Sequence, residues 1–163
     1  MTTLRTRHSP SLFTERGLRD KVSIATEEGL RGEVHRCFLS ILIPARNERE
    51  NLPHLLESLA LQLSPDVECW VCDDGSDDGT TEWLAQHATR LGVRWFRSAP
   101  RPEGWVGKNW ACYQLATRAQ GEWMLFLDAD LRSKASFIDV LRGYLTHTDA
   151  HLVSAIPTFT PSS

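Results

Sequence analysis

The side chains of this sequence that could do chemistry gather in short polar segments that follow apolar runs. The densest is the segment 73–79 (DDGSDDG), which holds four carboxylates within six residues. As a polar turn, it would cap the helix that follows. Four like charges repel one another, however, and carboxylates at strand ends can also accept hydrogen bonds from a base or from ribose hydroxyls. A turn and a nucleotide contact are therefore both open interpretations.

The segment 128–130 (DAD) is the most informative of these segments. It follows the nearly continuous apolar run 123–127 (WMLFL), which is typical of a central strand covered on both faces. Two neighbouring carboxylates suit a hard divalent cation that completes its shell with diphosphate oxygens and water. Such a cation would neutralise the charge that builds on a diphosphate leaving group. The alternative is a solvated cap before the next helix.

Two further segments are weaker signals. The segment 44–48 (PARNE) follows an apolar run; Asn47 could cap a helix there, and Glu48 would favour its positive end. The loop 101–109 (RPEGWVGKN) precedes a helix, whose N-terminus favours an anion. Lys108 could add a point charge for a phosphate, with Trp105 beside it facing a ligand. The loop lacks the pattern of a P-loop, so a surface lysine is the default interpretation.

The elements that must position these segments alternate along the chain. Apolar runs predict five strands, at 38–43, 67–72, 93–96, 123–127 and 151–156. Apolar residues spaced three and four apart predict helices between them. This alternation predicts an α/β fold with a mainly parallel sheet, and right-handed crossovers place helices on both faces. Ligands bind at the carboxyl ends of such strands, so the polar segments are expected to meet there.

Size and charge limit the class of protein. A chain of 163 residues suits one domain. Its net charge of −3 gives no general attraction for nucleic acid, so no nucleic-acid partner is expected. No run approaches the roughly 18 apolar residues of a membrane span, and residues 1–36 lack the apolar run of a signal peptide. We expect 1–36 to be a flexible N-terminal extension and 37–163 to be the folded domain.

The cysteines predict no metal or redox centre. Cys69 and Cys72 have the spacing of such a motif, but alternating strand side chains would point them to opposite sides of a sheet. No second Cys pair or Cys/His pair stands at zinc-finger spacing. We interpret the cysteines as buried free thiols, which fit a reducing, cytoplasmic compartment.

In their order and spacing, the segments 41–48 (ILIPARNE), 73–80 (DDGSDDGT), 107–108 (GK) and 127–130 (LDAD) together resemble the family 2 glycosyltransferases and their GT-A fold. The resemblance covers about residues 38–158. It implies an inverting transfer of a sugar from a nucleotide-diphosphate sugar, with a UDP-sugar as the first expectation. It also implies dependence on Mn²⁺ or Mg²⁺.

The resemblance assigns one set of positions to the donor site: Pro44, Arg46, Glu48, Asp73, Asp74, Lys108, Asp128 and Asp130. Asp74 would contact the base, with Asp73 in support. Asp128 would lie near the ribose, and Asp130 would ligate the cation that bridges the diphosphate. The resemblance assigns both residues to the metal site. Lys108 would lie near the base or the phosphates.

The acceptor side is less defined. The segment 104–111 (GWVGKNWA) resembles the subgroup associated with hopanoid or carotenoid-type lipids, which implies a lipid-linked acceptor and a peripheral position at the inner face of the cell membrane. Family members continue well past the Asp-x-Asp motif and supply an Asp or Glu general base there. After Asp130 the candidates are Asp139 and Asp149, in or beside a predicted helix. The domain is therefore expected to be truncated at its C-terminal side, with the base outside the chain.

Other classes remain open. The chain could be a catalytically incomplete remnant that binds a nucleotide and transfers nothing. A nucleotidyltransferase usually has a Gly-rich basic loop after its first strand, whereas 44–48 is acidic and Gly-free. A phosphoacceptor receiver domain would use Asp73 and Asp74 but leaves the segment 128–130 unexplained.

Overall fold

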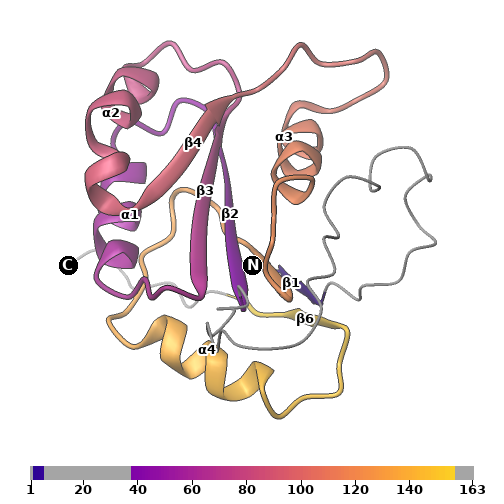
Figure 1. Cartoon of the computed structure of the whole chain (residues 1–163). Coiled ribbons are helices and arrows are strands. Elements are labelled where there is room, and N and C mark those ends of the chain that lie inside the picture. Colours follow the sequence, from indigo (N-terminus) through magenta and orange to yellow (C-terminus); the bar gives the residue numbers. More distant parts are fainter. Residues whose placement is uncertain (1, 6–37, 157–163) are drawn as a thin grey trace, which may run out of the picture.

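A sheet of six strands organises the chain, in the order β4-β3-β2-β5-β1-β6 (Figure 1). The computed structural model describes residues 2–5 and 38–156. The strands are β1 (Thr2–Arg5), β2 (Leu39–Ala45), β3 (Val67–Asp73), β4 (Val93–Arg97), β5 (Trp123–Phe126) and β6 (Leu152–Ser154). The helices are α1 (Leu52–Ala60), α2 (Thr80–His87), α3 (Gly107–Ala116) and α4 (Phe137–Leu145), with the short 3-10 helix η1 (Thr89–Leu91) after α2.

The central part of the sheet is parallel, as the sequence predicted. Strand β2 pairs in parallel with β3 on one side and with β5 on the other, and β3 pairs in parallel with β4. The antiparallel pairs are those that β1 makes with β5 and β6. Because β2, β3, β4 and β5 run in the same direction, their carboxyl ends share one edge of the sheet.

The start of the chain corrects one prediction. Thr2–Arg5 lie in the region expected to be a flexible extension, but these residues form β1 between β5 and β6. Arg5 pairs with Glu122 at 2.8 Å, and its guanidinium lies 5.6 Å from the ring centroid of Trp123. A four-residue strand with a single leucine has too little hydrophobic pattern to be recognised in isolation. The remainder of the predicted extension, 6–36, lies outside the described residues.

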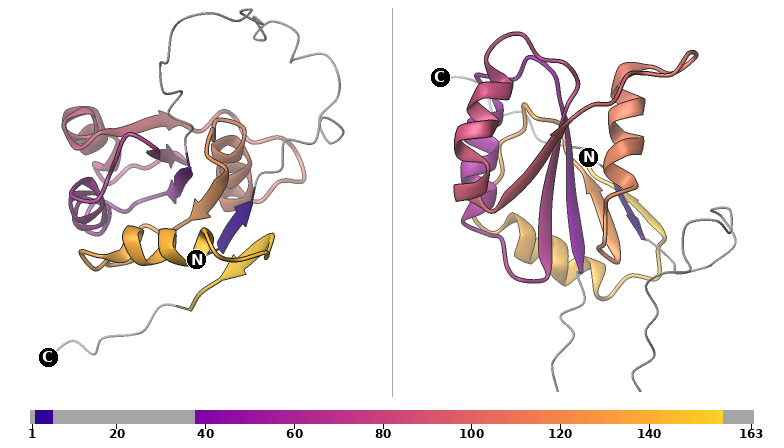
Figure 2. Two further views of the ribbon diagram at one scale, coloured as in Figure 1. Left: turned by 60° about the horizontal axis from the view of Figure 1, so that its bottom comes forward. Right: turned by 45° about the horizontal axis from the view of Figure 1, so that its top comes forward.

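The helices cover the two faces of the sheet unequally (Figures 1 and 2). Helices α1, α2 and α4 bury their apolar residues on one face, against strand residues such as Leu39, Ile41 and Ile43. Helix α3 packs on the other face, where Ala111 and Leu115 meet Leu42 and Cys72. The large core therefore lies on the α1–α2–α4 side, and α3 covers a smaller cluster.

The thiols follow the alternation of the strand. Cys69 and Cys72 are buried and free, and they belong to the clusters on opposite faces of the sheet. Desolvation raises the pKa of each thiol to about 12. Cys112 on α3 is also free and half-buried. The interpretation as buried free thiols is confirmed for Cys69 and Cys72, whereas Cys112 is free but only half-buried; Cys37 lies outside the described residues.

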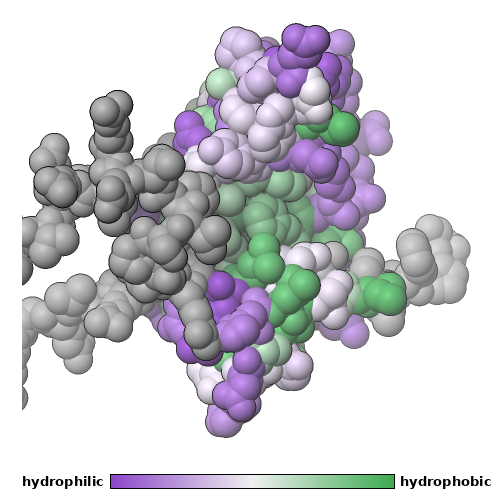
Figure 3. Space-filling model, turned by 90° about the vertical axis from the view of Figure 1, so that its right-hand side faces the viewer, coloured by the Kyte–Doolittle hydropathy of each residue, from purple (hydrophilic) through white to green (hydrophobic). Residues whose placement is uncertain are grey.

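The α3 face continues beyond α3 as an apolar surface. Met124 and Phe126 of β5 lie on this face and are half-buried, and Leu152 of β6 is 57% exposed. Figure 3 shows hydrophobic residues gathered in a hollow on this side of the molecule. Within residues 2–5 and 38–156, no helix is long and apolar enough to cross a bilayer.

Candidate functional site

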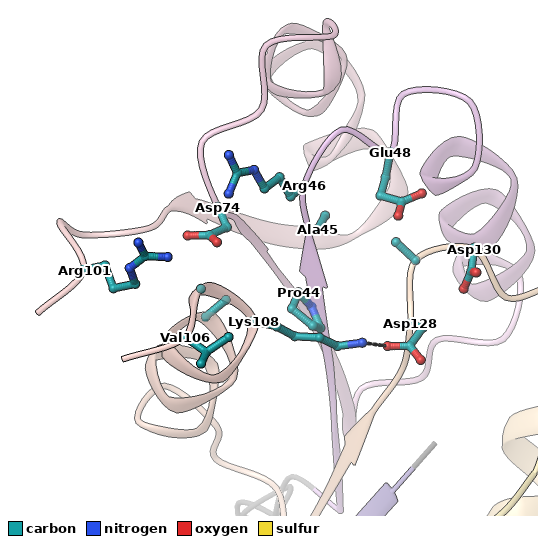
Figure 4. A pocket seen from close by; sticks show the side chains of 13 residues that line it. Pro44, Ala45, Arg46, Glu48, Asp74, Arg101, Val106, Lys108, Asp128 and Asp130 are labelled. Carbon is teal, nitrogen blue, oxygen red and sulfur yellow. Dashed lines mark hydrogen bonds and ion pairs between the residues drawn. The ribbon is translucent and has the colours of Figure 1, made fainter. Parts of the chain in front are cut away.

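A cavity of about 540 Å³ opens at the carboxyl edge of β2, β3 and β5, beside the N-terminus of α3 (Figure 4). It is lined by Pro44, Ala45, Arg46, Glu48, Asp74, Arg101, Val106, Gly107, Lys108, Ala111, Asp128, Ala129 and Asp130. Every donor-site position predicted from the sequence is in this lining except Asp73. Segments far apart in the sequence therefore meet at one place, at the sheet edge where they were expected.

Strand alternation decides which side chains reach the cavity. Pro44 and Cys72 are register partners in β2 and β3, and Cys72 packs against α3. Two residues after Cys72, Asp74 falls on the same side and lines the cavity. Asp73 is one position out of phase, so its side chain points to the opposite face.

Asp73 lies outside the cavity lining and is held by the loop that follows β3. Its carboxylate is fully buried and accepts hydrogen bonds from the Ser76 N–H (3.0 Å) and from the Thr81 hydroxyl. Arg97 Nε lies 3.8 Å from the same carboxylate. Asp73 thus holds the turn that presents Asp74.

A network of hydrogen bonds joins the loop after β2 to the loop after β3. The backbone N–H groups of Asn47 and Glu48 donate to Ser76 Oγ and Thr80 Oγ1, each at 3.0 Å. The Asp77 N–H donates back to Asn47 Oδ1 at 3.0 Å. Two loops that carry cavity residues are therefore fixed relative to each other.

The loop after β3, residues 73–78, is named here the acidic loop. It contacts the loop after β2 through a further carboxylate, that of Asp78. Asp78 accepts hydrogen bonds from the Arg49 N–H (2.9 Å) and from the N–H and hydroxyl of Thr80. Desolvation acts to raise the pKa of Asp78, but the hydrogen bonds from Thr80 and Arg49 outweigh it and lower the pKa. Of the four carboxylates in 73–78, Asp74 is the one that faces the cavity.

Asn47 does not cap α1, in contrast to the cap interpretation of its segment. It has a left-handed backbone with a φ of 57°, and its side chain contacts the acidic loop. The N-cap position is Asn51, which makes no side-chain cap hydrogen bond and instead donates to Glu48 Oε2 at 3.1 Å. This contact positions the Glu48 carboxylate at the cavity wall.

Gly107 lies at a close approach between the start of α3 and Asp74 after β3, where there is little room for a side chain. A Cβ atom at this position would lie 2.6 Å from Asp74 Oδ2 and 3.4 Å from a terminal nitrogen of Arg101. Asp74 and Arg101 are therefore neighbours at one end of the cavity, and Figure 4 shows Arg46 on the other side of Asp74. The sequence indicates no role for Arg101, because loop contacts of this kind have no periodic signal.

Lys108 occupies the opposite end of the cavity. Its Nζ lies 2.6 Å from Asp128 Oδ1, and both side chains are at least half exposed. The hydrogen bond to Asp128 raises the pKa of Lys108, and the charge of Asp130 adds to the shift. Figure 4 shows Asp130 on the same side of the cavity as Asp128. The predicted metal residues and the predicted phosphate lysine are thus brought together.

The carboxylate pair suits a cation that takes part of its shell from a ligand. Within residues 2–5 and 38–156, no group of three or more His, Cys, Asp or Glu side chains could hold a metal ion. Asp128 and Asp130 are exposed on either side of the buried Ala129. Two carboxylates are the contribution that Mg²⁺ and similar ions commonly take from a protein when phosphate oxygens complete their shell. The donor set therefore fits a divalent cation bound together with a diphosphate.

Trp105 does not line the cavity; it packs beside it. Its ring centroid lies 5.2 Å from those of Trp110 and Tyr113, which stack on each other at 5.5 Å. Trp105 and Tyr113 are 39% and 42% exposed, and Val106 is 65% exposed. The loop and α3 therefore present an exposed apolar cluster next to the cavity, named here the aromatic cluster (Trp105, Val106, Trp110, Tyr113).

A mainly parallel α/β sheet, with carboxylates, cationic side chains and a helix N-terminus around one carboxyl-edge cavity, matches the GT-A class of folds. The chain belongs to the family described as Glycosyl transferase family 2, whose sequence model matches residues 40–161.

Relatives agree with this assignment. The chain is 36% identical, over 123 residues, to a 4,4'-diaponeurosporenoate glycosyltransferase of Staphylococcus haemolyticus (strain JCSC1435), covering 73% of this chain and 32% of that protein. The fold matches S. aureus TarS 1-349 in complex with UDP, with a TM-score of 0.56, 25% identity, and coverage of 67% of this chain and 32% of that one.

A second solved structure shows the same fold. Glucosyl-3-phosphoglycerate synthase from Mycobacterium tuberculosis, in complex with Mn²⁺, UDP and glucosyl-3-phosphoglycerate, matches with a TM-score of 0.57 and 24% identity, covering 69% of this chain and 40% of that one. The chain spans about a third of the length of the S. haemolyticus relative.

Proposed function

We propose that the chain forms the donor-binding part of an enzyme that transfers a sugar from a nucleotide-diphosphate sugar, with a UDP-sugar as the donor. The observation that carries this proposal is the convergence of Asp74, Lys108, Asp128 and Asp130 on one cavity at the carboxyl edge of the sheet. UDP in the matched structures of TarS and of the synthase supports the choice of nucleotide.

The two ends of the cavity suit the two ends of a nucleotide diphosphate. Asp74 can accept hydrogen bonds from a base, and the guanidinium of Arg101 beside it can hydrogen-bond or stack. At the other end, Lys108 can attract the diphosphate, and Asp128 and Asp130 can hold Mn²⁺ or Mg²⁺. When bound, the cation would neutralise the negative charge that develops on the departing diphosphate.

The transfer is proposed to be inverting, which requires a base to deprotonate the acceptor hydroxyl as it attacks the anomeric carbon. Asp139 on α4 and Asp149 are exposed, and neither lines the cavity. No carboxylate of the described stretch after Asp130 is therefore assigned as the base. A domain that binds the nucleotide and transfers nothing by itself is the competing function.

The acceptor is proposed to be a lipid reached from the cytoplasmic face of a membrane. The aromatic cluster supports this, because Val106 belongs both to the cluster and to the cavity wall. Exposed tryptophan and tyrosine rings suit a membrane interface, where an apolar body and a polar tip are both satisfied. The S. haemolyticus relative, a 4,4'-diaponeurosporenoate glycosyltransferase, supports the same acceptor class.

The donor proposal is tested by calorimetric titration of the purified chain with UDP, UMP, GDP and dTDP in the presence of Mn²⁺. The expected result is preference for UDP, with UMP at least tenfold weaker because it lacks the second phosphate for Lys108 and the cation. If none of these nucleotides binds to a chain shown to be folded by circular dichroism, the donor-site proposal is wrong.

A further inference from the structure

The shortest contact inside the cavity joins two of its own binding residues. Lys108 Nζ donates to Asp128 Oδ1 at 2.6 Å, while the two side chains remain 63% and 50% exposed (Figure 4). An exposed ion pair of this kind stabilises little, so it can be exchanged for other partners at small cost. Asp130 adds a second negative charge near the ammonium group.

The same carboxylate would be needed by a divalent cation. Asp128 and Asp130 are the carboxylates at this end of the cavity, and an ammonium group and a hard cation both seek carboxylate lone pairs. Lys108 and a divalent cation therefore compete for the Asp128 carboxylate.

The cavity also offers Lys108 a second anion once a nucleotide enters. Lys108 stands in the first turn of α3, whose N-terminus lines the cavity and favours negative charge. Its four-carbon stem lets the ammonium move several ångströms without any change in the backbone. A diphosphate bound between Lys108 and the carboxylate pair could thus take the lysine as the cation takes Asp128.

Resting on the proposed function, we propose that Lys108 is an exchangeable counter-ion: it pairs with Asp128 when the donor is absent and transfers to the diphosphate when nucleotide and divalent cation bind. Lys108 then couples the two ligands. The cation must displace Lys108 to bind alone, whereas with the nucleotide present Lys108 already has another partner. Each ligand therefore raises the affinity for the other by the same factor.

The test measures Mn²⁺ binding by loss of the free-ion electron paramagnetic resonance signal, with and without UDP, for wild type and Lys108→Met. Without UDP, we expect Lys108→Met to bind Mn²⁺ about three- to fivefold more tightly, which is the upper part of the range that corresponds to one exposed ion pair. With UDP this advantage disappears. A merely structural role for Lys108 would weaken Mn²⁺ binding, so the sign of the change is diagnostic.

The same coupling is measured from the nucleotide side by calorimetry. Lys108→Met should weaken UDP about three- to fivefold in saturating Mn²⁺ and leave UDP affinity in EDTA nearly unchanged. Because coupling is reciprocal, the coupling factor measured from UDP affinity must equal the one measured from Mn²⁺ affinity. The factor can therefore be measured from the UDP side even if Mn²⁺ alone binds weakly.

Lys134→Met is the matched control. It removes the same charge from the loop after Asp130, and Lys134 is exposed and not part of the cavity lining. We expect it to change every affinity less than twofold. An equal tightening of Mn²⁺ binding by Lys134→Met would overturn the contact mechanism in favour of a general charge effect.

Different results would overturn the counter-ion role of Lys108 and the proposed donor-binding function. Metal-dependent UDP binding by wild type, with a coupling factor that Lys108→Met leaves unchanged, overturns the role of Lys108 alone. Absence of UDP binding by folded wild type, with or without Mn²⁺, overturns the proposed function and the counter-ion with it.

Discussion

The acidic loop after β3 and the carboxylate pair after β5 have similar composition and different uses. In the loop 73–78, Asp73 is buried and Asp78 accepts hydrogen bonds from backbone and hydroxyl groups. After β5, Asp128 and Asp130 are both exposed in the cavity. In the dense run, Asp73 and Asp78 thus stabilise local structure and Asp74 faces the cavity, whereas both members of the sparse pair after β5 face the cavity.

The largest expected effect on the free energy of unfolding is that of Asp73→Ala in the acidic loop. Asp73→Ala leaves the buried N–H of Ser76 and the hydroxyl of Thr81 without their acceptor, and we expect it to lower the free energy of unfolding by about 3 kcal/mol. Chemical denaturation measures this. Asp73→Asn keeps one acceptor oxygen and should lose less. A change below about 0.5 kcal/mol for Asp73→Ala would show that the buried carboxylate does not stabilise the turn.

Asp66, a carboxylate outside the cavity, is expected to contribute stability that depends on pH. The hydrogen bond from Arg142 lowers the pKa of Asp66 to about 2, against the opposing effect of burial. A depressed pKa contributes stability above the unfolded value of about 4, and this stability is lost as the pH falls toward 2. We expect Asp66→Asn to cost about 1–2 kcal/mol at pH 7, a range discounted for solvent screening.

Unfolding of wild type and Asp66→Asn is compared between pH 7 and pH 2. The two curves should converge as the pH falls from about 4 to about 2. A gap that stays constant over this range would mean that the Asp66–Arg142 pair is not the source of the stability.

A smaller effect should appear in binding without a comparable effect on stability. Gly107→Ala would place a Cβ atom 2.6 Å from Asp74 Oδ2, and the flexible carboxylate must move. We expect UDP affinity to fall about tenfold, with the free energy of unfolding changed by less than about 1 kcal/mol. Calorimetry and denaturation measure the two quantities.

The matched control for Gly107 lies in α4. Gly143→Ala meets open space in a helix and should stabilise the fold by about 0.5–1 kcal/mol without changing UDP affinity. Unchanged UDP affinity in Gly107→Ala would show that Asp74 does not contact the nucleotide.

The smallest expected effect is that of Asp77→Asn. Asp77 is exposed and enters the loop network through its backbone N–H, so both stability and UDP affinity should stay within about 0.5 kcal/mol of wild type. A large loss in either measurement would show that the carboxylates of the loop act as one electrostatic unit.

Periodicity accounts for what could be predicted from the sequence. Apolar runs located the parallel strands, and the position of each polar segment after a strand located the cavity edge. The same two-residue alternation that separated Cys69 from Cys72 also separates Asp73 from Asp74, so the structural role of Asp73 could have been predicted from it.

Other features depend on tertiary contacts that leave no periodic signal. The left-handed backbone of Asn47 serves the contact between two loops. Arg101 reaches the cavity from an irregular loop. Strand β1 is defined by pairing with strands more than a hundred residues away along the chain, which no local pattern of four residues could indicate.

The central claim is that the pair after β5 binds a cation and a nucleotide diphosphate together. It is tested most directly by calorimetric titration of UDP into wild type with Mn²⁺, into wild type with EDTA, and into Asp130→Ala with Mn²⁺. We predict binding by wild type with Mn²⁺ and a loss of about a hundredfold or more in the other two titrations, with the folding of Asp130→Ala unchanged. Equal UDP affinity in all three titrations would contradict the account.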